Sequence, residues 1–344
     1  MAPQSHENLV GIARLAATAD VLESKRRVEY HLLPTRRFIS KCPNEKLPFQ
    51  WTINPYRGCE FGCKYCYARY THEFMELREG RQFEEQIYAK QWNPDAFRQE
   101  LRKVPLGDGI AIGTATDPYQ PAERRFGITR EMLRVIAGEG SWRVWITTKS
   151  DLVVRDIDLL RQAMRRNSVG VMMTVTTLDE KLARALEPYA PRPALRIDAV
   201  RRLREAGIPA GVGCSPILPL INDSERGIEG VARAAATAGA LRFHANLLFL
   251  SPSSYAVFLP FLEEYAPALV RRYIERYSQS AYLKGEYPKW IAERVAAIRS
   301  RHGFAVRHEE FLPEAWSTDT QLSLFEVDKP ALSQTLPEYV DKAI

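Results

Sequence analysis

The sequence has no long hydrophobic run, no internal repeat and only five cysteines. Of its 344 residues 45% are hydrophobic and 26% are charged, which is a globular composition. Its uninterrupted apolar stretches fall far short of the roughly 20 residues that span a bilayer. The amino terminus also lacks the basic-then-apolar pattern of a secretory signal. We therefore expect a cytoplasmic protein with no membrane span.

The cysteines are too few and too unevenly spread for a disulfide scaffold. Five is an odd number, and the chain shows no export signal. Cys59, Cys63 and Cys66 lie within one short segment, whereas Cys42 and Cys214 stand apart. Three clustered thiols in a reducing compartment indicate metal ligands. The net charge of +6 permits an anionic partner without identifying one.

The pattern along the chain divides it into three parts. Residues 1–45 form a basic arm, 46–252 an α/β core, and 253–344 a mainly helical extension with an irregular tail after Trp316. Three rings interrupt the basic stretch of the arm: Tyr30, His31 and Phe38. The arm either lies over the core or contacts phosphates and stacks on bases.

Short β-branched runs alternate with helical patterns in the core. Strands are expected at residues 51–54, 109–116, 143–148, 170–177, 209–217 and 241–250. Helices are expected at residues 129–137, 156–166, 180–186, 194–206 and 224–238, and in the extension within 255–283 and 288–302. This alternation requires parallel strands joined by crossover helices. Six units predict a partial TIM-like (β/α)6 barrel, because a closed barrel needs eight.

The cysteines have the spacing Cys-x3-Cys-x2-Cys and directly follow the first expected strand. Gly58 and Gly62 let the backbone fold tightly around a compact group. Three thiolates this close can each hold one corner of an iron–sulfur cube, and the lack of a fourth leaves one iron open to a small ligand. The alternative is a Cys3His zinc site with His72, although zinc sites more often use Cys-x2-Cys pairs.

This motif, with Tyr65 just before its last cysteine, resembles that of the radical S-adenosylmethionine (radical SAM) enzymes. Segments 113–121, 147–150 and 216–223 look like the spore photoproduct lyase branch, also described as DNA repair photolyase-like, with similarity over about residues 50–250.

The resemblance implies a 4Fe–4S cluster on Cys59, Cys63 and Cys66, with S-adenosylmethionine on the open iron. It implies one-electron cleavage of the sulfonium and hydrogen abstraction by a 5′-deoxyadenosyl radical. A reductant such as flavodoxin or ferredoxin and a nucleic-acid substrate are the partners it suggests.

The same resemblance suggests four contacts to S-adenosylmethionine. The Tyr65 backbone matches the adenine contact, Lys149 matches a lysine that reaches the carboxylate, and Thr116 and Thr174 fall where the lyase has serines. For the threonines, ordinary strand chemistry is the alternative. Asp117 either caps a turn before Pro118 or binds the cofactor amino group.

The sequence departs from the lyase pattern at the hydrogen-returning cysteine, because Thr114 stands in its place. Cys214 is a candidate for a relocated donor, and the alternative is a buried thiol that acts as a small hydrophobe. Tyr67 and Tyr119 are further candidates for a hydrogen-atom relay. Arg57 either tunes the cluster, binds a polar substrate or makes a surface ion pair.

Three functions remain open. The first is a radical SAM enzyme of the lyase-like branch. The second is an iron–sulfur and S-adenosylmethionine-binding regulatory or redox-sensing protein without turnover. The third is a zinc-stabilised nucleic-acid-binding module.

Overall fold

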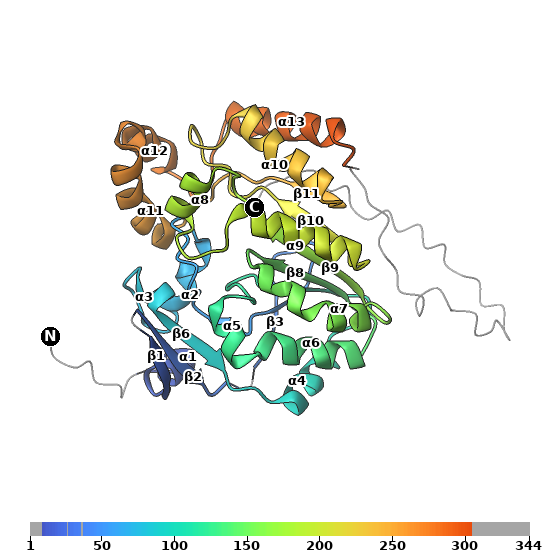
Figure 1. Ribbon diagram of the computed structural model, residues 1–344. Coiled ribbons are helices and arrows are strands. Elements are labelled where there is room, and N and C mark those ends of the chain that lie inside the picture. The colour runs from blue at the N-terminus through green and yellow to red at the C-terminus, as the bar shows by residue number, and fades with distance from the viewer. Residues whose placement is uncertain (1–8, 26, 36, 305–344) are drawn as a thin grey trace.

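The computed structural model describes residues 9–25, 27–35 and 37–304 (Figure 1), so the expected tail after Trp316 lies outside the described residues. Its larger sheet has the strand order β11-β10-β9-β8-β7-β4-β3. These strands are β3 (Ile39–Lys41), β4 (Trp51–Ile53), β7 (Gly109–Ile112), β8 (Arg143–Thr148), β9 (Ser168–Thr174), β10 (Ala210–Gly213) and β11 (Arg242–His244). All neighbours from β4 to β11 are parallel, whereas β3 is antiparallel to β4. The six expected strands therefore form an open, sequentially ordered sheet.

The larger helices between the parallel strands include the five expected in the core and two that the sequence patterns did not indicate, at residues 94–101 and 121–126. They are α4 (Pro94–Leu101), α5 (Pro121–Phe126), α6 (Ile128–Gly138), α7 (Ile157–Ala163), α8 (Glu180–Leu186), α9 (Pro193–Glu205) and α10 (Glu225–Thr237). Figure 1 shows three of these helices, α6, α7 and α9, in front of the larger sheet. It shows α10 above α9, which α10 contacts. The helix expected at 156–166 is preceded by a 3-10 turn, η3 (Asp151–Asp156).

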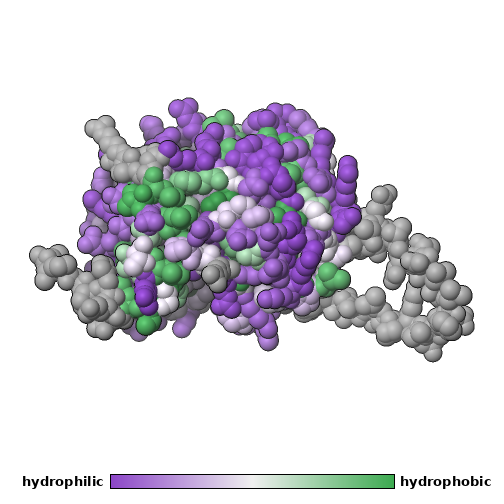
Figure 2. Space-filling view, turned by 90° about the horizontal axis from the view of Figure 1, so that it is seen from below, coloured by the Kyte–Doolittle hydropathy of each residue, from purple (hydrophilic) through white to green (hydrophobic). Residues whose placement is uncertain are grey.

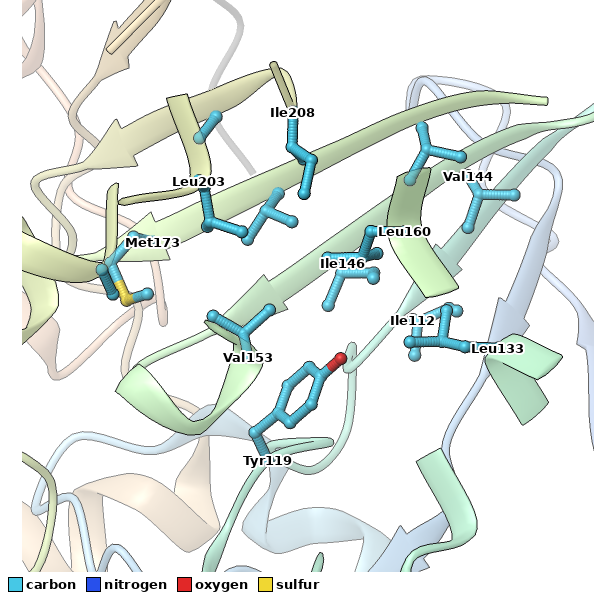
Figure 3. Packing of buried hydrophobic residues seen from close by; sticks show 14 of the residues in the cluster. Ile112, Tyr119, Leu133, Val144, Ile146, Val153, Leu160, Met173, Leu203 and Ile208 are labelled. Atoms are coloured by element: carbon cyan, nitrogen blue, oxygen red, sulfur yellow. The ribbon is translucent and has the colours of Figure 1, made fainter. Parts of the chain in front are cut away.

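The main core lies between this helical layer and the sheet (Figure 3). Ile112 and Ile146 come from the strands, and Leu133, Leu160 and Leu203 come from the helices; none is more than 1% exposed. Burying each such side chain contributes about 1.5–3 kcal/mol. This packing fixes the sheet whose carboxyl edge carries the site residues.

Some strands are shorter than expected because the chain turns at their carboxyl ends. β7 stops at Ile112, since Gly113 has a φ of +92°. A Cβ at Gly113 would lie 2.6 Å from both the Pro118 ring and the Thr147 carbonyl oxygen. Only glycine allows so close an approach. Residues 114–118 therefore form a loop over the sheet edge.

A second sheet, which the sequence did not indicate, has the order β1-β2-β6-β5. Its strands are β1 (Val21–Lys25), β2 (Val28–Leu33), β5 (Tyr56–Arg57) and β6 (Gln86–Lys90), and α1 (Gly11–Ala17) precedes them. Tyr30, His31 and Phe38 are at most 8% exposed. The idea that these rings stack on bases is therefore wrong, because each is packed inside the protein.

Residues 252–304 are mainly helical, whereas the rest of the expected helical extension, 305–344, lies outside the described residues. The 255–283 pattern is divided into α11 (Pro252–Tyr265), η4 (Pro267–Leu269) and α12 (Val270–Tyr277), because Pro267 cannot continue α11. α13 (Glu286–Arg301) packs on α10 and β11. None of the described helices is both long and apolar enough to cross a bilayer.

The surface is mixed in character. Seen from below, hydrophobic residues gather toward the left, where Figure 1 places the second sheet, and the right side is mainly hydrophilic (Figure 2).

Candidate active site

The three clustered cysteines lie in a single loop, which packs against helices of the carboxyl-terminal part. The loop follows β5 and ends at η2 (Tyr67–Arg69), which contacts α11. All three thiols are free; Cys59 and Cys63 are buried and Cys66 is partly buried. They belong to one hydrophobic cluster with side chains of α8, α11 and α12. The loop is therefore enclosed by packing.

Two glycines give the loop its shape. Gly58 has a φ of +82°, and a Cβ there would lie 2.8 Å from the carbonyl oxygens of Phe83 and Gln86. Gly62 has a φ of +63°, and its Cβ would lie 3.1 Å from the Tyr189 ring. Both positions combine a left-handed backbone with a close neighbour, which L-residues with side chains tolerate poorly. The glycines therefore allow tight turns of the loop, and its folding around a bound group stays a prediction.

Thr116 and Gln120 hold the start of the loop. The Thr116 hydroxyl donates to the Gly58 carbonyl at 2.5 Å, and the Gln120 amide donates to the same oxygen at 3.0 Å. Gln120 also accepts from the Glu60 N–H at 2.9 Å. The Cys59 N–H donates to a backbone carbonyl at 2.9 Å. Backbone hydrogen bonds on both sides thus fix the first cysteine.

The electrostatics of the thiols fit a bound metal cluster. Burial raises the pKa of Cys59, Cys63 and Cys66, to about 12 for Cys63. The positive charge of Lys149 lowers the pKa of Cys63 and Cys66, and that of Arg69 also lowers the pKa of Cys66. The effect of burial is larger, so both pKa values are raised. Buried thiols of this kind stay protonated until a metal replaces the proton. Three of them in one enclosed loop suit a thiolate-ligated iron–sulfur cluster.

The zinc alternative requires His72 to join the cysteines. Its Nε2 atom instead lies 3.1 Å from the Gln86 carbonyl oxygen, and its ring packs edge-on against Phe83 and Tyr88. Within the described residues, no three Cys, His, Asp or Glu side chains converge on a single ion. A cubane differs, because each cysteine binds a different iron. The geometry therefore favours the cluster over zinc.

The other predicted site residues lie along one edge of the sheet. Thr116 follows β7, Lys149 follows β8, Thr174 ends β9 and Cys214 follows β10. Because these strands are parallel and adjacent, their carboxyl ends meet at the same edge. The structure thus brings these four residues to the side of the sheet where α/β folds place ligands.

Lys149 carries a positive charge close to the cysteine loop. Its Nζ atom lies 5.6 Å from the centre of the Tyr65 ring. Burial alone would lower the pKa of Lys149, but attraction to the thiolate form of Cys63 and to the Glu187 carboxylate more than offsets this, so the pKa is raised. Lys149 is therefore a protonated ammonium suited to binding a carboxylate.

Asp117 has the turn-forming role rather than a free carboxylate. It accepts from the Tyr119 N–H at 2.9 Å, the Thr148 hydroxyl at 2.7 Å and the Lys149 N–H at 2.7 Å. These bonds tie the loop after β7 to the end of β8. Burial nevertheless raises the pKa of Asp117. Asp117 thus positions the backbone at Lys149.

A buried polar network, which the sequence reasoning missed, supports Tyr65. The Tyr65 hydroxyl donates to Glu187, and the Thr176 hydroxyl donates to the same carboxylate at 2.7 Å. Glu187 pairs with Arg196 at 2.6 Å. One signal was available: Arg196 occupies a core-facing position of α9, in line with Ala199, Val200 and Leu203. A charge on an apolar helical stripe indicates a buried partner.

Cys214 and Thr114 lie in different surroundings. Cys214 is 1% exposed, its Sγ lies 3.8 Å from the Thr176 carbonyl oxygen, and burial raises its pKa to about 12. The Thr114 hydroxyl accepts from the Asn54 amide at 3.1 Å, and the Tyr67 hydroxyl donates to the Thr114 carbonyl. Thr114 thus sits beside the cysteine loop, whereas Cys214 belongs to the main core.

Comparisons with known proteins agree with this geometry. The profile of the Radical SAM superfamily matches residues 53–233. An uncharacterized protein of Mycobacterium tuberculosis is 33% identical over 289 residues, 83% of this chain and 85% of the relative. An uncharacterized protein of Methanocaldococcus jannaschii is 33% identical over 186 residues, 54% of this chain and 66% of the relative.

Solved structures of spore photoproduct lyase variants share the fold. The match to one variant, solved with dinucleoside spore photoproduct, extends over 87% of this chain and 86% of the lyase chain, at 15% identity and a TM-score of 0.58. The match to another variant, solved with bound AdoMet and the same dinucleoside, extends over 81% of this chain and 89% of the lyase chain, at 16% identity and a TM-score of 0.54.

Proposed function

The chain belongs to the radical SAM superfamily of enzymes, and we propose that it cleaves S-adenosylmethionine reductively and abstracts hydrogen from a nucleic-acid substrate. The observation that carries the proposal is the enclosed loop with Cys59, Cys63 and Cys66, next to the protonated Lys149. The alternative is a redox-sensing protein that binds the same groups without turnover. Production of 5′-deoxyadenosine distinguishes the two.

The three cysteines would hold a 4Fe–4S cluster. When bound, such a cluster supplies the electron that splits the sulfonium and so generates the 5′-deoxyadenosyl radical. The Lys149 ammonium would bind the carboxylate of S-adenosylmethionine. The Tyr65 backbone would meet the adenine, and Thr174 would offer a hydroxyl at the end of β9.

Thr116 has a supporting role in this proposal. Its hydroxyl already donates to the Gly58 carbonyl and accepts from the Gln120 amide at 2.9 Å. Its remaining lone pair can serve an amino group of the cofactor. Thr116 thus links the cysteine loop to the sheet edge, while Lys149 provides the charge.

Exposed rings beside the loop support a nucleic-acid substrate. Three rings within eight positions after the last cysteine are exposed: Tyr67 by 46%, Tyr70 by 41% and Phe74 by 58%. The guanidinium of Arg57, two positions before the first cysteine, makes no ion pair or hydrogen bond with any described residue, and burial lowers its pKa. Exposed rings next to an unpaired guanidinium suit stacked bases and a phosphate. We infer that the substrate lies across this surface.

The reaction we propose differs from lyase chemistry in its last step. Thr114 cannot return a hydrogen atom, because its O–H bond is too strong. The enclosed Cys214 remains the first candidate donor, and Tyr67 the second. Without a hydrogen donor, the substrate radical would give an oxidised product only by passing its unpaired electron to a one-electron acceptor, such as the oxidised cluster.

We further infer a partial barrel for the core, 46–252, because β4 to β11 follow one another in sequential order. A cytoplasmic flavodoxin or ferredoxin would supply the electron. We propose two further parts of the chain beside this core: the basic segment 1–45 and the mainly helical extension 253–344.

The deciding experiment is an anaerobic assay with dithionite. The loaded enzyme should convert S-adenosylmethionine to 5′-deoxyadenosine, and deuterium from a labelled oligonucleotide should enter the product. Binding of S-adenosylmethionine without any 5′-deoxyadenosine would favour the sensor. Turnover without deuterium transfer would exclude that oligonucleotide as substrate.

A further inference from the structure

A surface cavity of about 260 Å³ lies where α12 ends and α13 begins. Its walls include Arg276, Tyr282, Lys284 and Tyr287, and none of the residues assigned above to the cysteine site. The volume is close to the lower end of the ~300–1,000 Å³ range of small-molecule sites. The cavity is therefore a separate site on the carboxyl-terminal helical part.

Two cations of this cavity lack an acidic partner. Neither the Arg276 guanidinium nor the Lys284 ammonium makes an ion pair or hydrogen bond with any residue of the described ranges. The acidic side chains nearest in sequence are already engaged: Glu275 pairs with Arg271 at 2.8 Å, and Glu286 pairs with Lys289 at 2.9 Å. Two unneutralised charges at one cavity favour an anionic ligand.

The Arg276 guanidinium is held in place before any ligand arrives. It lies 5.0 Å from the centre of the Tyr287 ring. The Tyr287 hydroxyl donates to the Asp223 carboxylate at 2.6 Å, and Arg294 donates to the Asp223 carbonyl at 2.8 Å. A guanidinium stacked on a fixed ring loses little freedom on binding, which favours affinity.

The same cavity presents an aromatic face. Tyr282 is 42% exposed, and its ring centre lies 4.6 Å from that of Phe249. The Tyr282 N–H donates to the Ser280 hydroxyl at 3.1 Å, which fixes the backbone under the ring. Leu283 adds an apolar side chain to the wall. A ring-bearing ligand can therefore stack here while its charged end meets the cations.

We propose that this cavity binds a nucleoside phosphate, with the phosphate on Arg276 and Lys284 and the base against Tyr282. The cations of the walls complement the anion of such a ligand, and the aromatic face complements its planar ring. The ligand is either a free nucleotide or the phosphorylated end of a strand. α12 also packs, through Tyr273 and Tyr277, in the hydrophobic cluster that contains Cys59 and Cys63. The cavity thus lies at the end of a helix that shares a packed cluster with the cysteine loop.

Binding is tested by calorimetry on the anaerobically purified full chain with saturating S-adenosylmethionine, which occupies the cysteine site. The probes are thymidine 5′-monophosphate, a 5′-phosphorylated tetrathymidylate, inorganic phosphate and thymidine. Arg276→Ala and Lys284→Ala should each weaken nucleotide binding about ten- to a hundredfold. Arg271→Ala is the matched control, because Arg271 lies on the same helix, is paired with Glu275, and does not line the cavity.

Tyr282→Ala separates stacking from charge. It should weaken binding of the nucleotide and of thymidine but leave binding of phosphate unchanged. Tighter binding of the tetranucleotide than of the monophosphate would identify a strand as the source, and equal binding a free nucleotide. The proposal is overturned if no probe binds, or if binding is the same in Arg276→Ala, Lys284→Ala and Arg271→Ala. Neither result bears on whether the protein forms 5′-deoxyadenosine, so failure of the two proposals can be told apart.

Discussion

The Glu187 carboxylate and the Arg196 guanidinium lie 2.6 Å apart, and each residue is only 1% exposed. Arg196 also donates to the carbonyl oxygens of Pro191 and Thr174, and Glu187 accepts from Tyr65. Burial of either charge alone is costly, and the pair persists because each group has several partners. This pair joins the cysteine loop to β9 and α9.

Removing one partner of this pair should destabilise the protein strongly. Glu187→Leu leaves the Arg196 charge buried without a counter-charge, at a cost of about 3–5 kcal/mol in unfolding free energy. Glu187→Leu combined with Arg196→Leu should recover much of that loss. Urea unfolding measures both. A single variant within about 0.5 kcal/mol of the parent protein would show that the pair is not a structural anchor.

Cys63→Ala should abolish iron binding while the sheet stays folded. The anaerobically purified protein is expected to be brown and to hold about four irons. Iron analysis and circular dichroism check the two parts of the prediction. Cys42→Ala is the control, because Cys42 lies outside the loop. Full iron content in Cys63→Ala would show that the cysteine loop does not hold the iron.

Lys149→Ala should weaken S-adenosylmethionine binding by about 1.5–3 kcal/mol, or roughly ten- to a hundredfold, because a charge-assisted hydrogen bond is lost. The absorption spectrum of the cluster should stay the same. Equilibrium dialysis measures the dissociation constant. Lys289→Ala, an exposed lysine on α13, should leave it unchanged. Equal affinity in Lys149→Ala and the parent protein would place Lys149 outside the site.

The protein should cleave S-adenosylmethionine but not reverse spore photoproduct efficiently. Thr114 provides no thiol to quench the product radical, so side products should accumulate. Chromatography of the reaction with spore-photoproduct dinucleotide detects any thymidylyl-thymidine. Thr114→Cys should increase clean repair. Rapid multi-turnover repair by the parent protein would refute this prediction, and its loss in Cys214→Ala would identify Cys214 as a relocated donor.

Stability should fall on mild acidification because of His72. Burial lowers its pKa to about 4, against about 6.5 in the unfolded chain. Between these values the unfolded chain binds a proton that the folded protein does not, so stability is lost as the pH falls from about 6.5 to 4, by up to about 3 kcal/mol. Urea unfolding at pH 7 and pH 4.5 measures the loss. His72→Gln should flatten it, and an unchanged slope would contradict the assignment to His72.

Local sequence patterns determined much of this protein. The spacing of Cys59, Cys63 and Cys66 with Gly58 defines a loop within a few residues of chain, and α8 begins and ends at the expected residues. The order of six parallel strands also followed, because apolar runs alternate with helical stripes and short crossovers allow one sheet order. Neither inference needed a contact between distant segments.

The tertiary structure alone decided the contacts between distant segments. β2 and β6 pair in parallel although more than 50 residues separate them, and this pairing buries Tyr30. The contact of Tyr65 with Glu187 spans 122 positions. Local propensity cannot choose such partners, because their free energy comes from burial and matched charge that exist only after the chain has folded. The sequence therefore determined the cysteine motif, and packing decided what surrounds it.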